Sequence, residues 1–421
     1  MHRPEHRLEV PRSESAMREA TVYIHFPWCL EKCPYCDFVS YKAERPAIPS
    51  EAYADAVIAE FDARVATIGE GLDERRFISI FVGGGTPSLW AIESLGRVLN
   101  RLRERLTFVA DAEVTVECNP SSLTEEHARA LRSIGVNRLS VGVQSLDDNE
   151  LRFLGRLHDA QGAIDALDAA RAAGFSRLSG DLIYALPSQA HDASLPMAGR
   201  LIDLGLTHLS AYQLTIEPGT RFGELAKRGR LPLADEGASA DAFLALDAVV
   251  ESRGLRHYEV SNFAVPGQES RHNVGYWRGL EYLALGCGAY GYWRMEAQGN
   301  PSHGLRYRNE VIAEKYMHSA RTMVPGVPFI DDDSARTTTV SVEALDGETL
   351  VKERIMLGLR LADGFDVTAA AQDLCVPIVT RERERAVAKM ASRGRLVEEG
   401  SRWRVPKDKW LLVDGTAAEL F

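Results

Sequence analysis

Cysteine is scarce in this sequence, with six residues in a chain of 421. A protein of this length does not rely on so few cysteines for a disulfide scaffold, and such usage is typical of a reducing compartment. The sequence also contains no apolar run of transmembrane length, and its first twenty residues lack the apolar core of a signal peptide. These absences predict a cytoplasmic protein, and they leave peripheral contact with a membrane open.

Positive charge is also in short supply. Lysine and arginine together number 49 against 60 aspartates and glutamates, which gives a net charge of −11. Binding the phosphates of a nucleic acid requires a basic face, so we expect no nucleic-acid partner. The overall mixture is otherwise that of a globular protein, and the length allows one large domain and a smaller one.

Half of the cysteines lie together, as Cys29, Cys33 and Cys36 in the spacing C-x3-C-x2-C. A structural zinc site needs four ligands, commonly from paired C-x-x-C arms, and this spacing supplies no fourth. A [4Fe–4S] cluster held by three thiolates instead keeps one iron open for a small molecule. S-adenosylmethionine (SAM) can bind that iron through its amino and carboxylate groups, which is how radical chemistry starts from SAM. The spacing therefore favours an iron–sulfur cluster over zinc or unconnected thiols.

Short apolar runs alternate with helical patterns through the first half of the chain. The runs are rich in β-branched residues and end in glycine, proline or polar residues; they begin at Thr21, Phe77, Ala112, Arg138, Arg177 and His208. Between them, Thr124 is a helix N-cap and Gly135 ends the same helix. Six βα repeats predict an α/β fold, in which right-handed crossovers curl a parallel sheet into a partial (β/α)6 TIM-like barrel.

Polar and glycine residues follow several of these strands. They are the run from Gly83 to Pro87, then Glu117, Asn119, Gln144 and Asp181. Taken singly, each could be a tight turn or a helix cap. Barrels of βα units place their functional residues at the carboxyl ends of the strands. Because these polar residues follow successive strands after the cysteine segment, we expect them to form one site with it.

These motifs, over roughly residues 20 to 310, resemble the radical SAM superfamily, its coproporphyrinogen dehydrogenase-like branch, and within it the heme chaperone family HemW. The resemblance implies that Cys29, Cys33 and Cys36 hold a [4Fe–4S] cluster. It further implies that SAM is bound by Tyr23, Tyr35, Gly84, Gly85, Thr86, Glu117, Gln144, Arg156 and Asp181. Glycines suit the SAM amino group because their missing side chains let backbone carbonyls approach an ammonium.

Two features bear on which member of the branch the chain resembles. The anaerobic coproporphyrinogen III oxidase has a further cysteine two residues after the third ligand, where this chain has Phe38. The segment His272-Asn273-Val274-Gly275-Tyr276-Trp277 is similar to the HNxxYW heme-binding motif of the chaperones. That similarity implies heme binding through His272, Asn273, Tyr276 and Trp277, since a neutral imidazole can ligate heme iron and aromatic rings can pack on a porphyrin. From the residues alone, a hydrogen-bonded buried corner is the alternative.

The resemblance implies a protein that binds a [4Fe–4S] cluster, SAM and heme and delivers heme to acceptors such as respiratory hemoproteins. It also implies that the chain can form a homodimer. The alternative is an enzyme: an oxygen-independent coproporphyrinogen III oxidase that decarboxylates a porphyrinogen by radical chemistry, or another radical SAM tailoring enzyme. The residues do not assign catalytic groups for such a reaction, and the chaperone is favoured over the oxidase.

The sequence divides into four parts. We expect a mobile tail over residues 1–20, the barrel with an extension over 21–325, a polar loop or insertion over 326–345, and a small helical domain over 346–421. Helical patterns from Leu350 and Arg381 precede a hairpin that turns at Gly400, which resembles a winged helix. Acidic residues alternate with its arginines, so we expect a lid or a partner-docking role rather than DNA binding.

Overall fold

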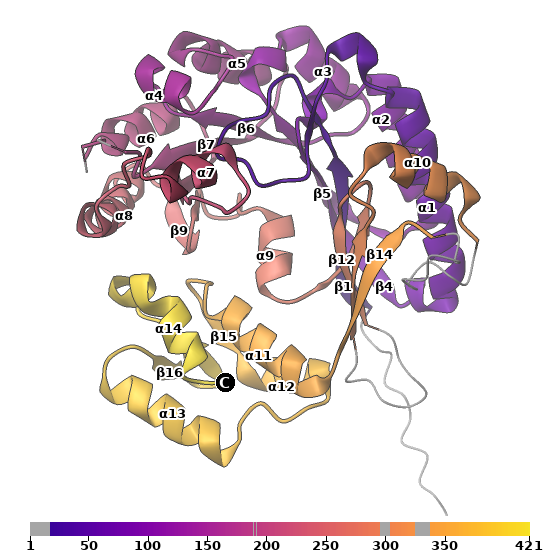
Figure 1. Cartoon of the computed structure of the whole chain (residues 1–421). Helices are drawn as coiled ribbons and strands as arrows, with labels where there is room; N and C mark the ends of the chain where they lie inside the picture. The colour runs from indigo at the N-terminus through magenta and orange to yellow at the C-terminus, as the bar shows by residue number, and fades with distance from the viewer. Residues whose placement is uncertain (1–16, 188, 191, 295–303, 325–336) are drawn as a thin grey trace, which may run out of the picture.

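The computed structural model describes residues 17–187, 189–190, 192–294, 304–324 and 337–421. A curved sheet with helices on its outer face forms the upper part of the molecule in Figure 1, and a smaller helical domain lies below it. The expected tail over residues 1–20 lies almost entirely outside the described residues, and the first strand already begins at Arg18. No helix within the described ranges combines the length and the apolar character that crossing a bilayer requires.

Six parallel strands form the barrel, and each pairs with the next along the chain. They are β1 (Arg18–Phe26), β4 (Arg75–Gly84), β5 (Phe108–Cys118), β6 (Arg138–Gln144), β7 (Arg177–Tyr184) and β8 (His208–Gln213). The helices between them are α1 (Ser50–Ile68), α2 (Ile92–Arg105), α3 (Glu125–Ser133), α4 (Asp148–Phe153), α5 (Ala160–Ala172) and α6 (Ser194–Asp203). The predicted partial (β/α)6 barrel is confirmed. Its sheet is open, because β1 and β8 continue into further strands instead of pairing with each other.

Strand β1 illustrates why these segments form the sheet. Ala20, Val22, Ile24 and Phe26 alternate along it and are completely buried in the main hydrophobic core. Helix α3 begins as predicted, since the Thr124 hydroxyl accepts the backbone N–H of residue 127 at 3.2 Å. The intervening strand residues face the interior of the barrel, and these positions make the site.

Further strands extend the sheet at both edges. At the β8 edge, α7 (Arg221–Lys227) and α8 (Glu236–Glu251) precede the antiparallel β9 (Arg256–Glu259) and β10 (Asn262–Ala264). At the β1 edge lie β11 (Glu281–Leu285), β12 (Tyr290–Arg294), β13 (Gly304–Asn309) and β14 (Thr339–Leu345), and α10 (Ala313–Thr322) packs on α1. A completely buried ion pair between Glu60 and Arg64 (2.7 Å) joins α1 to this extension, because Asn309 and Tyr316 also bond to the Glu60 carboxylate.

The expected polar loop over residues 326–345 needs correction at its carboxyl end. Residues Thr339–Leu345 form β14, which pairs antiparallel with β13 and is an edge strand of the large sheet. The physical reason is the β-branched alternation in TVSVEAL, which favours a strand although it directly follows the polar stretch. Most of that stretch, residues 325–336, lies outside the described residues.

The carboxyl-terminal part has its own hydrophobic core. It contains α11 (Gly347–Gly358), α12 (Val367–Leu374), α13 (Arg381–Ser392), α14 (Val413–Ala418) and the three-stranded sheet of β15 (Phe365–Asp366), β17 (Arg402–Arg404) and β16 (Val397–Glu399). The predicted helices and hairpin are present, in a winged-helix-like order. Asp373 joins this domain to the barrel sheet, because its carboxylate pairs with Arg294 at 2.7 Å and with Arg354 at 2.8 Å.

The short helix α9 (Arg271–Trp277) lies between the barrel and the carboxyl-terminal domain in Figure 1. It contacts β1 and β4 of the barrel and α11 of the carboxyl-terminal domain. The Ser270 hydroxyl caps the helix by accepting the Asn273 backbone N–H at 3.3 Å. Helix α9 therefore lies between the barrel interior on one side and the second domain on the other.

Candidate functional site

One cavity of about 660 Å³ occupies the barrel interior and opens at the carboxyl ends of the strands. It is lined by every residue for which a cluster or SAM contact was predicted: Cys29, Cys33, Cys36, Tyr23, Tyr35, Gly84, Gly85, Thr86, Glu117, Gln144, Arg156 and Asp181. Its volume is in the range that encloses a drug-sized ligand. The fold thus brings residues that are up to 158 positions apart in the sequence (Tyr23 to Asp181) to one site.

The cysteine segment is a loop whose ends are fixed by a small parallel bridge. Strand β2 (Trp28–Cys29) pairs with β3 (Tyr41–Lys42), and the Ala43 backbone N–H donates to the Cys29 carbonyl at 2.9 Å. Burial raises the pKa of the Cys29 thiol to about 11, and burial also raises the pKa of Cys36. A metal centre offsets this cost, because thiolates rather than thiols are the ligands.

The three thiols suit a cluster better than a single ion. Among the described residues, no three His, Cys, Asp or Glu side chains converge closely enough to hold one metal ion. Ligands of a single zinc ion must approach one point at about 2.3 Å. Thiolates that bind separate irons of a cluster have no such requirement, so the loop fits the [4Fe–4S] prediction.

The glycines at the end of β4 let this strand lie against the cysteine loop. The Gly85 and Thr86 backbone N–H groups donate to the carbonyls of Phe26 (2.7 Å) and Trp28 (2.8 Å). Gly84 has a positive φ of 116°, and a side chain there would run into the His25 ring. The missing side chains therefore have a structural role in addition to the contact with SAM that was predicted.

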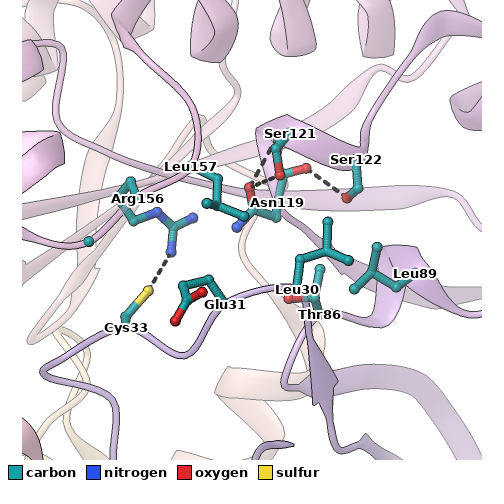
Figure 2. A pocket seen from close by; sticks show the side chains of 11 residues that line it. Leu30, Glu31, Cys33, Thr86, Leu89, Asn119, Ser121, Ser122, Arg156 and Leu157 are labelled. Carbon is teal, nitrogen blue, oxygen red and sulfur yellow. Dashed lines mark hydrogen bonds between the residues drawn. The ribbon is translucent and has the colours of Figure 1, made fainter. Parts of the chain in front are cut away.

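Arg156 lies beside the cysteines with part of its guanidinium group unpaired. Its Nη1 donates to the Cys33 sulfur at 3.4 Å and its Nη2 to the Gly142 carbonyl at 2.8 Å, while its buried Nε has no partner. A smaller recess continues past it between Glu31, Asn119 and Leu157 (Figure 2). Buried donors normally have an acceptor, so the orphaned N–H is an observation in favour of a bound ligand with carboxylate or hydroxyl oxygens.

Two carboxyl groups face the same cavity. Burial raises the pKa of Glu117 to about 8, and the nearby Asp181 raises it further; burial also raises the pKa of Asp181. The Gly84 backbone N–H donates to Glu117 at 3.0 Å, and the Ser140 hydroxyl donates to Asp181 at 3.2 Å. A cationic ligand would favour the ionised carboxylates, so the positively charged SAM fits this wall of the cavity.

His25 is a positioning residue that the sequence did not single out. The Val39 carbonyl can only accept, so His25 Nε2 carries the proton and donates to it at 2.8 Å. Its Nδ1 therefore accepts the Tyr23 hydroxyl proton at 2.9 Å, and burial lowers the pKa of the imidazole to about 4. A neutral His25 thus joins β1 to the end of the cysteine loop.

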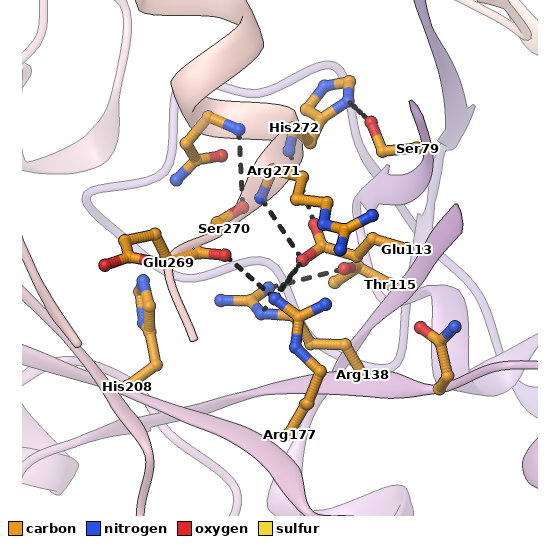
Figure 3. Close-up of polar contacts among 12 residues, drawn as sticks. Ser79, Glu113, Thr115, Arg138, Arg177, His208, Glu269, Ser270, Arg271 and His272 are labelled. Carbon is orange, nitrogen blue, oxygen red and sulfur yellow. Dashed lines mark hydrogen bonds and ion pairs between the residues drawn. The ribbon is translucent and has the colours of Figure 1, made fainter. Parts of the chain in front are cut away.

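The residues of the HNxxYW-like segment do not all face one place. The His272 ring stacks on Phe81 with centroids 5.0 Å apart. It also lies 3.3 Å from the Ser79 hydroxyl (Figure 3). Burial lowers the pKa of His272 to about 4, which keeps it neutral as iron ligation requires. Asn273 lines the large cavity.

Tyr276 and Trp277 face the carboxyl-terminal domain instead. Tyr276 lines a crevice of about 40 Å³ between the barrel extension and α11, together with Tyr282 and Tyr292. Arg360 of the second domain lies over the Trp277 ring at 5.5 Å. Of these four residues, Asn273 lines the barrel cavity and His272 lies behind it, against cavity-lining Phe81.

The comparisons with known proteins agree with this architecture. Residues 23–193 match the model of the radical SAM superfamily, and residues 345–412 match the HemN C-terminal domain. The heme chaperone HemW of Mycobacterium tuberculosis is 32% identical over 400 residues, which cover 95% of this chain and 94% of that protein. HemW of Lactococcus lactis is 33% identical and covers 82% of each chain.

Among solved structures, coproporphyrinogen III oxidase (HemN) from Escherichia coli superposes with a TM-score of 0.75 at 21% identity, covering 96% of this chain and 90% of that one. This likeness shows the fold. The identity to the chaperones over nearly the whole chain shows the family: the chain belongs to the HemW family of radical SAM proteins.

Proposed function

We propose that this protein is a heme chaperone that binds a [4Fe–4S] cluster, SAM and heme and passes heme to acceptor proteins such as respiratory hemoproteins. The observation that carries the proposal is the single cavity lined by the three cysteines and all nine residues predicted to bind SAM. The relatives that cover most of the chain are heme chaperones, which favours this role over others that use the same fold.

Cys29, Cys33 and Cys36 would hold the cluster, which when bound supplies a one-electron reductant to SAM. Arg156 would donate its orphaned N–H to the ligand beside the cluster, and Glu117 and Asp181 would face the SAM cation and its ribose. We place the protein in the cytoplasm because its few cysteines, three of them clustered, suit a reducing compartment. A homodimer is a further prediction that the resemblance supplies, and the sequence leaves peripheral membrane contact open.

Anaerobic reconstitution tests the cluster. We expect iron and sulfide near four per chain in the wild type, and a large loss when Cys29, Cys33 or Cys36 is replaced by serine. Cys375→Ser is the matched control, because Cys375 is exposed and lies in the other domain. Equal iron contents in all four variants would remove the cysteine loop as the cluster site.

Heme titration with an absorbance readout tests the second part. We propose His272 as an axial ligand that heme reaches from the barrel cavity, since its ring stacks on cavity-lining Phe81 and its neighbour Asn273 lines the cavity. His272→Ala should shift the Soret band and weaken binding, whereas His318→Ala, at an exposed position on α10, should change neither. Unchanged spectra for His272→Ala would exclude it as a ligand.

The second candidate function is oxidative decarboxylation of coproporphyrinogen III, which the HemN-like fold and the complete SAM cavity favour. Phe38 argues against it, because the oxidase has a cysteine at this position. Anaerobic incubation with dithionite, SAM and coproporphyrinogen III separates the two functions. Formation of protoporphyrinogen would show that the protein is an enzyme.

A further inference from the structure

The barrel cavity extends well beyond the part assigned to the cluster and SAM. On β6 the alternate residues Arg138, Ser140, Gly142 and Gln144 all line it, and Ser210 lines it from β8, the second strand along in the sheet. Barrels of this kind usually fill the interior with bulky branched side chains. The small hydroxyl residues here leave space, so the cavity reaches down to Arg138.

Arg138 lies at the opposite end of the cavity from the cysteines. It begins β6, and Gln144 ends the strand six residues later, which corresponds to about 20 Å at ~3.3 Å per residue. The Arg138 side chain is only 3% exposed. Among the described residues its one hydrogen bond runs from Nη1 to the Thr115 hydroxyl at 3.4 Å (Figure 3).

Among the described residues, Arg138 has a single ion pair, and its distance is at the upper limit for such a contact. The nearest carboxylate is Glu113, 4.0 Å from the Arg138 Nε. Glu113 already pairs with Arg177 at 2.7 Å and accepts the backbone N–H groups of Arg271 (3.2 Å) and His272 (3.4 Å). Arg177 and Arg138 therefore share the Glu113 carboxylate, and the contact of Arg138 is the longer and weaker one. Burying the Arg138 charge costs free energy unless an anion pairs with the guanidinium group.

The other two carboxyl groups of the cavity lie toward the SAM side. Glu117 accepts the Gly84 backbone N–H beside the cysteine loop, and with its pKa raised to about 8 by burial it is largely neutral at pH 7. Asp181 accepts from Ser140. Arg138 lowers the pKa of both carboxyl groups, but among the described residues it forms a hydrogen bond with neither.

We propose that Arg138 anchors a carboxylate-binding subsite at the floor of the cavity and that a propionate of the tetrapyrrole occupies it. The planar guanidinium group of arginine matches a carboxylate with two parallel hydrogen bonds. Asn273 lines the same floor, and its neighbour His272 lies close enough that the Arg138 charge lowers the pKa of its imidazole. One macrocycle therefore contacts Arg138 and His272 together; this inference rests on the heme-binding function proposed above.

The test compares ferric heme with heme dimethyl ester, whose propionates carry no charge, on cluster-loaded protein. A charge-assisted pair of this kind predicts that the wild type binds the diacid about 10-fold to 100-fold more tightly than the ester. Arg138→Gln should bind both ligands equally, at about the wild-type affinity for the ester, and Arg138→Lys should keep part of the preference. Arg97→Gln, at a half-exposed arginine on α2, is the control and should keep the full preference.

The outcomes distinguish the subsite from the function on which it rests. Equal wild-type affinities for heme and its ester would overturn the subsite while leaving heme binding intact, and this comparison needs no variant to fold. An undiminished preference in Arg138→Gln would overturn it as well. If the wild type bound neither ligand, both the heme function and the subsite would fall. SAM affinity should change less than twofold in Arg138→Gln; an equal loss of SAM and heme would assign the carboxylate to SAM instead.

Discussion

Replacing Gly85 with alanine tests whether the end of β4 must lie directly against the cysteine loop. A Cβ on Gly85 would lie 2.7 Å from the Trp28 carbonyl oxygen and 3.0 Å from that of Phe26. Both carbonyls are fixed, because they accept the backbone N–H groups of Thr86 and of Gly85 itself. The added methyl group therefore has to displace backbone, which cannot rotate away as a flexible side chain can.

Overpacking of this kind costs about 1–3 kcal/mol of unfolding free energy. The displaced carbonyl belongs to Trp28, the residue before the first cluster cysteine, so we expect Gly85→Ala also to lower the iron content after reconstitution. Gly415→Ala is the matched control. Gly415 lies in α14 with no heavy atom within 4 Å of an added Cβ, so alanine there should stabilise the protein by about 0.5–1 kcal/mol.

Urea unfolding followed by circular dichroism measures the first effect, and iron and sulfide analysis of the same samples measures the second. The reasoning is refuted if Gly85→Ala unfolds at the wild-type urea midpoint and retains a full cluster. A loss of iron without any loss of stability would also contradict it, because the clash acts on the backbone whether or not a cluster is bound.

Three further predictions concern the cavity wall, the cysteine loop and the contact between domains. The native pKa of Glu117 is raised from 4.5 to about 8, so in this pH window the native state keeps a proton that the unfolded state has lost. Stability therefore falls as pH rises through the window. Glu117→Gln does not titrate, so its Tm should rise relative to that of the wild type between pH 5 and pH 8.5. His25→Ala removes the side chain that joins β1 to the end of the cysteine loop, so iron should be lost faster on anaerobic dialysis, and retention at the wild-type rate would remove this role. Asp373→Asn weakens the contacts to Arg294 and Arg354, which should destabilise the chain by about 1–3 kcal/mol in urea and expose the domain boundary to limited proteolysis.

Much of the barrel could be predicted because its strands have local signals. The run that begins at Thr21 alternates apolar residues toward the helices, and the glycines after Phe81 mark the place where β4 meets the cysteine loop. The cluster and SAM residues follow from these strands, since parallel strands bring their carboxyl ends to one edge of the sheet. The same reasoning did not find β14, whose partner β13 lies 30 or more residues earlier in the chain.

Arg138 could not be predicted as a cavity residue, although it stands in the expected strand. A charged residue at the first position of a strand usually lies at the solvent edge, and the sequence RLSVGVQS gives no sign of the opposite. Its burial arises from tertiary structure, because α9 and Glu113 close the amino-terminal end of the barrel over it. The position of Arg138 in the cavity therefore becomes evident from the closed end of the barrel and not from the local sequence.

The HNxxYW-like segment shows a related limit of sequence reasoning. Residues four apart on a helix lie on one side of it, so His272 and Tyr276 would be expected to contact the same ligand face. Their surroundings differ because the barrel wall ends beside His272, at Ser79 and Phe81, and the second domain begins beside Tyr276. Heme contact through Tyr276 and Trp277 stays a prediction, and both rings lie against the carboxyl-terminal domain. Those two aromatic residues hold α9 against the carboxyl-terminal domain, which fixes where the histidine lies in the barrel.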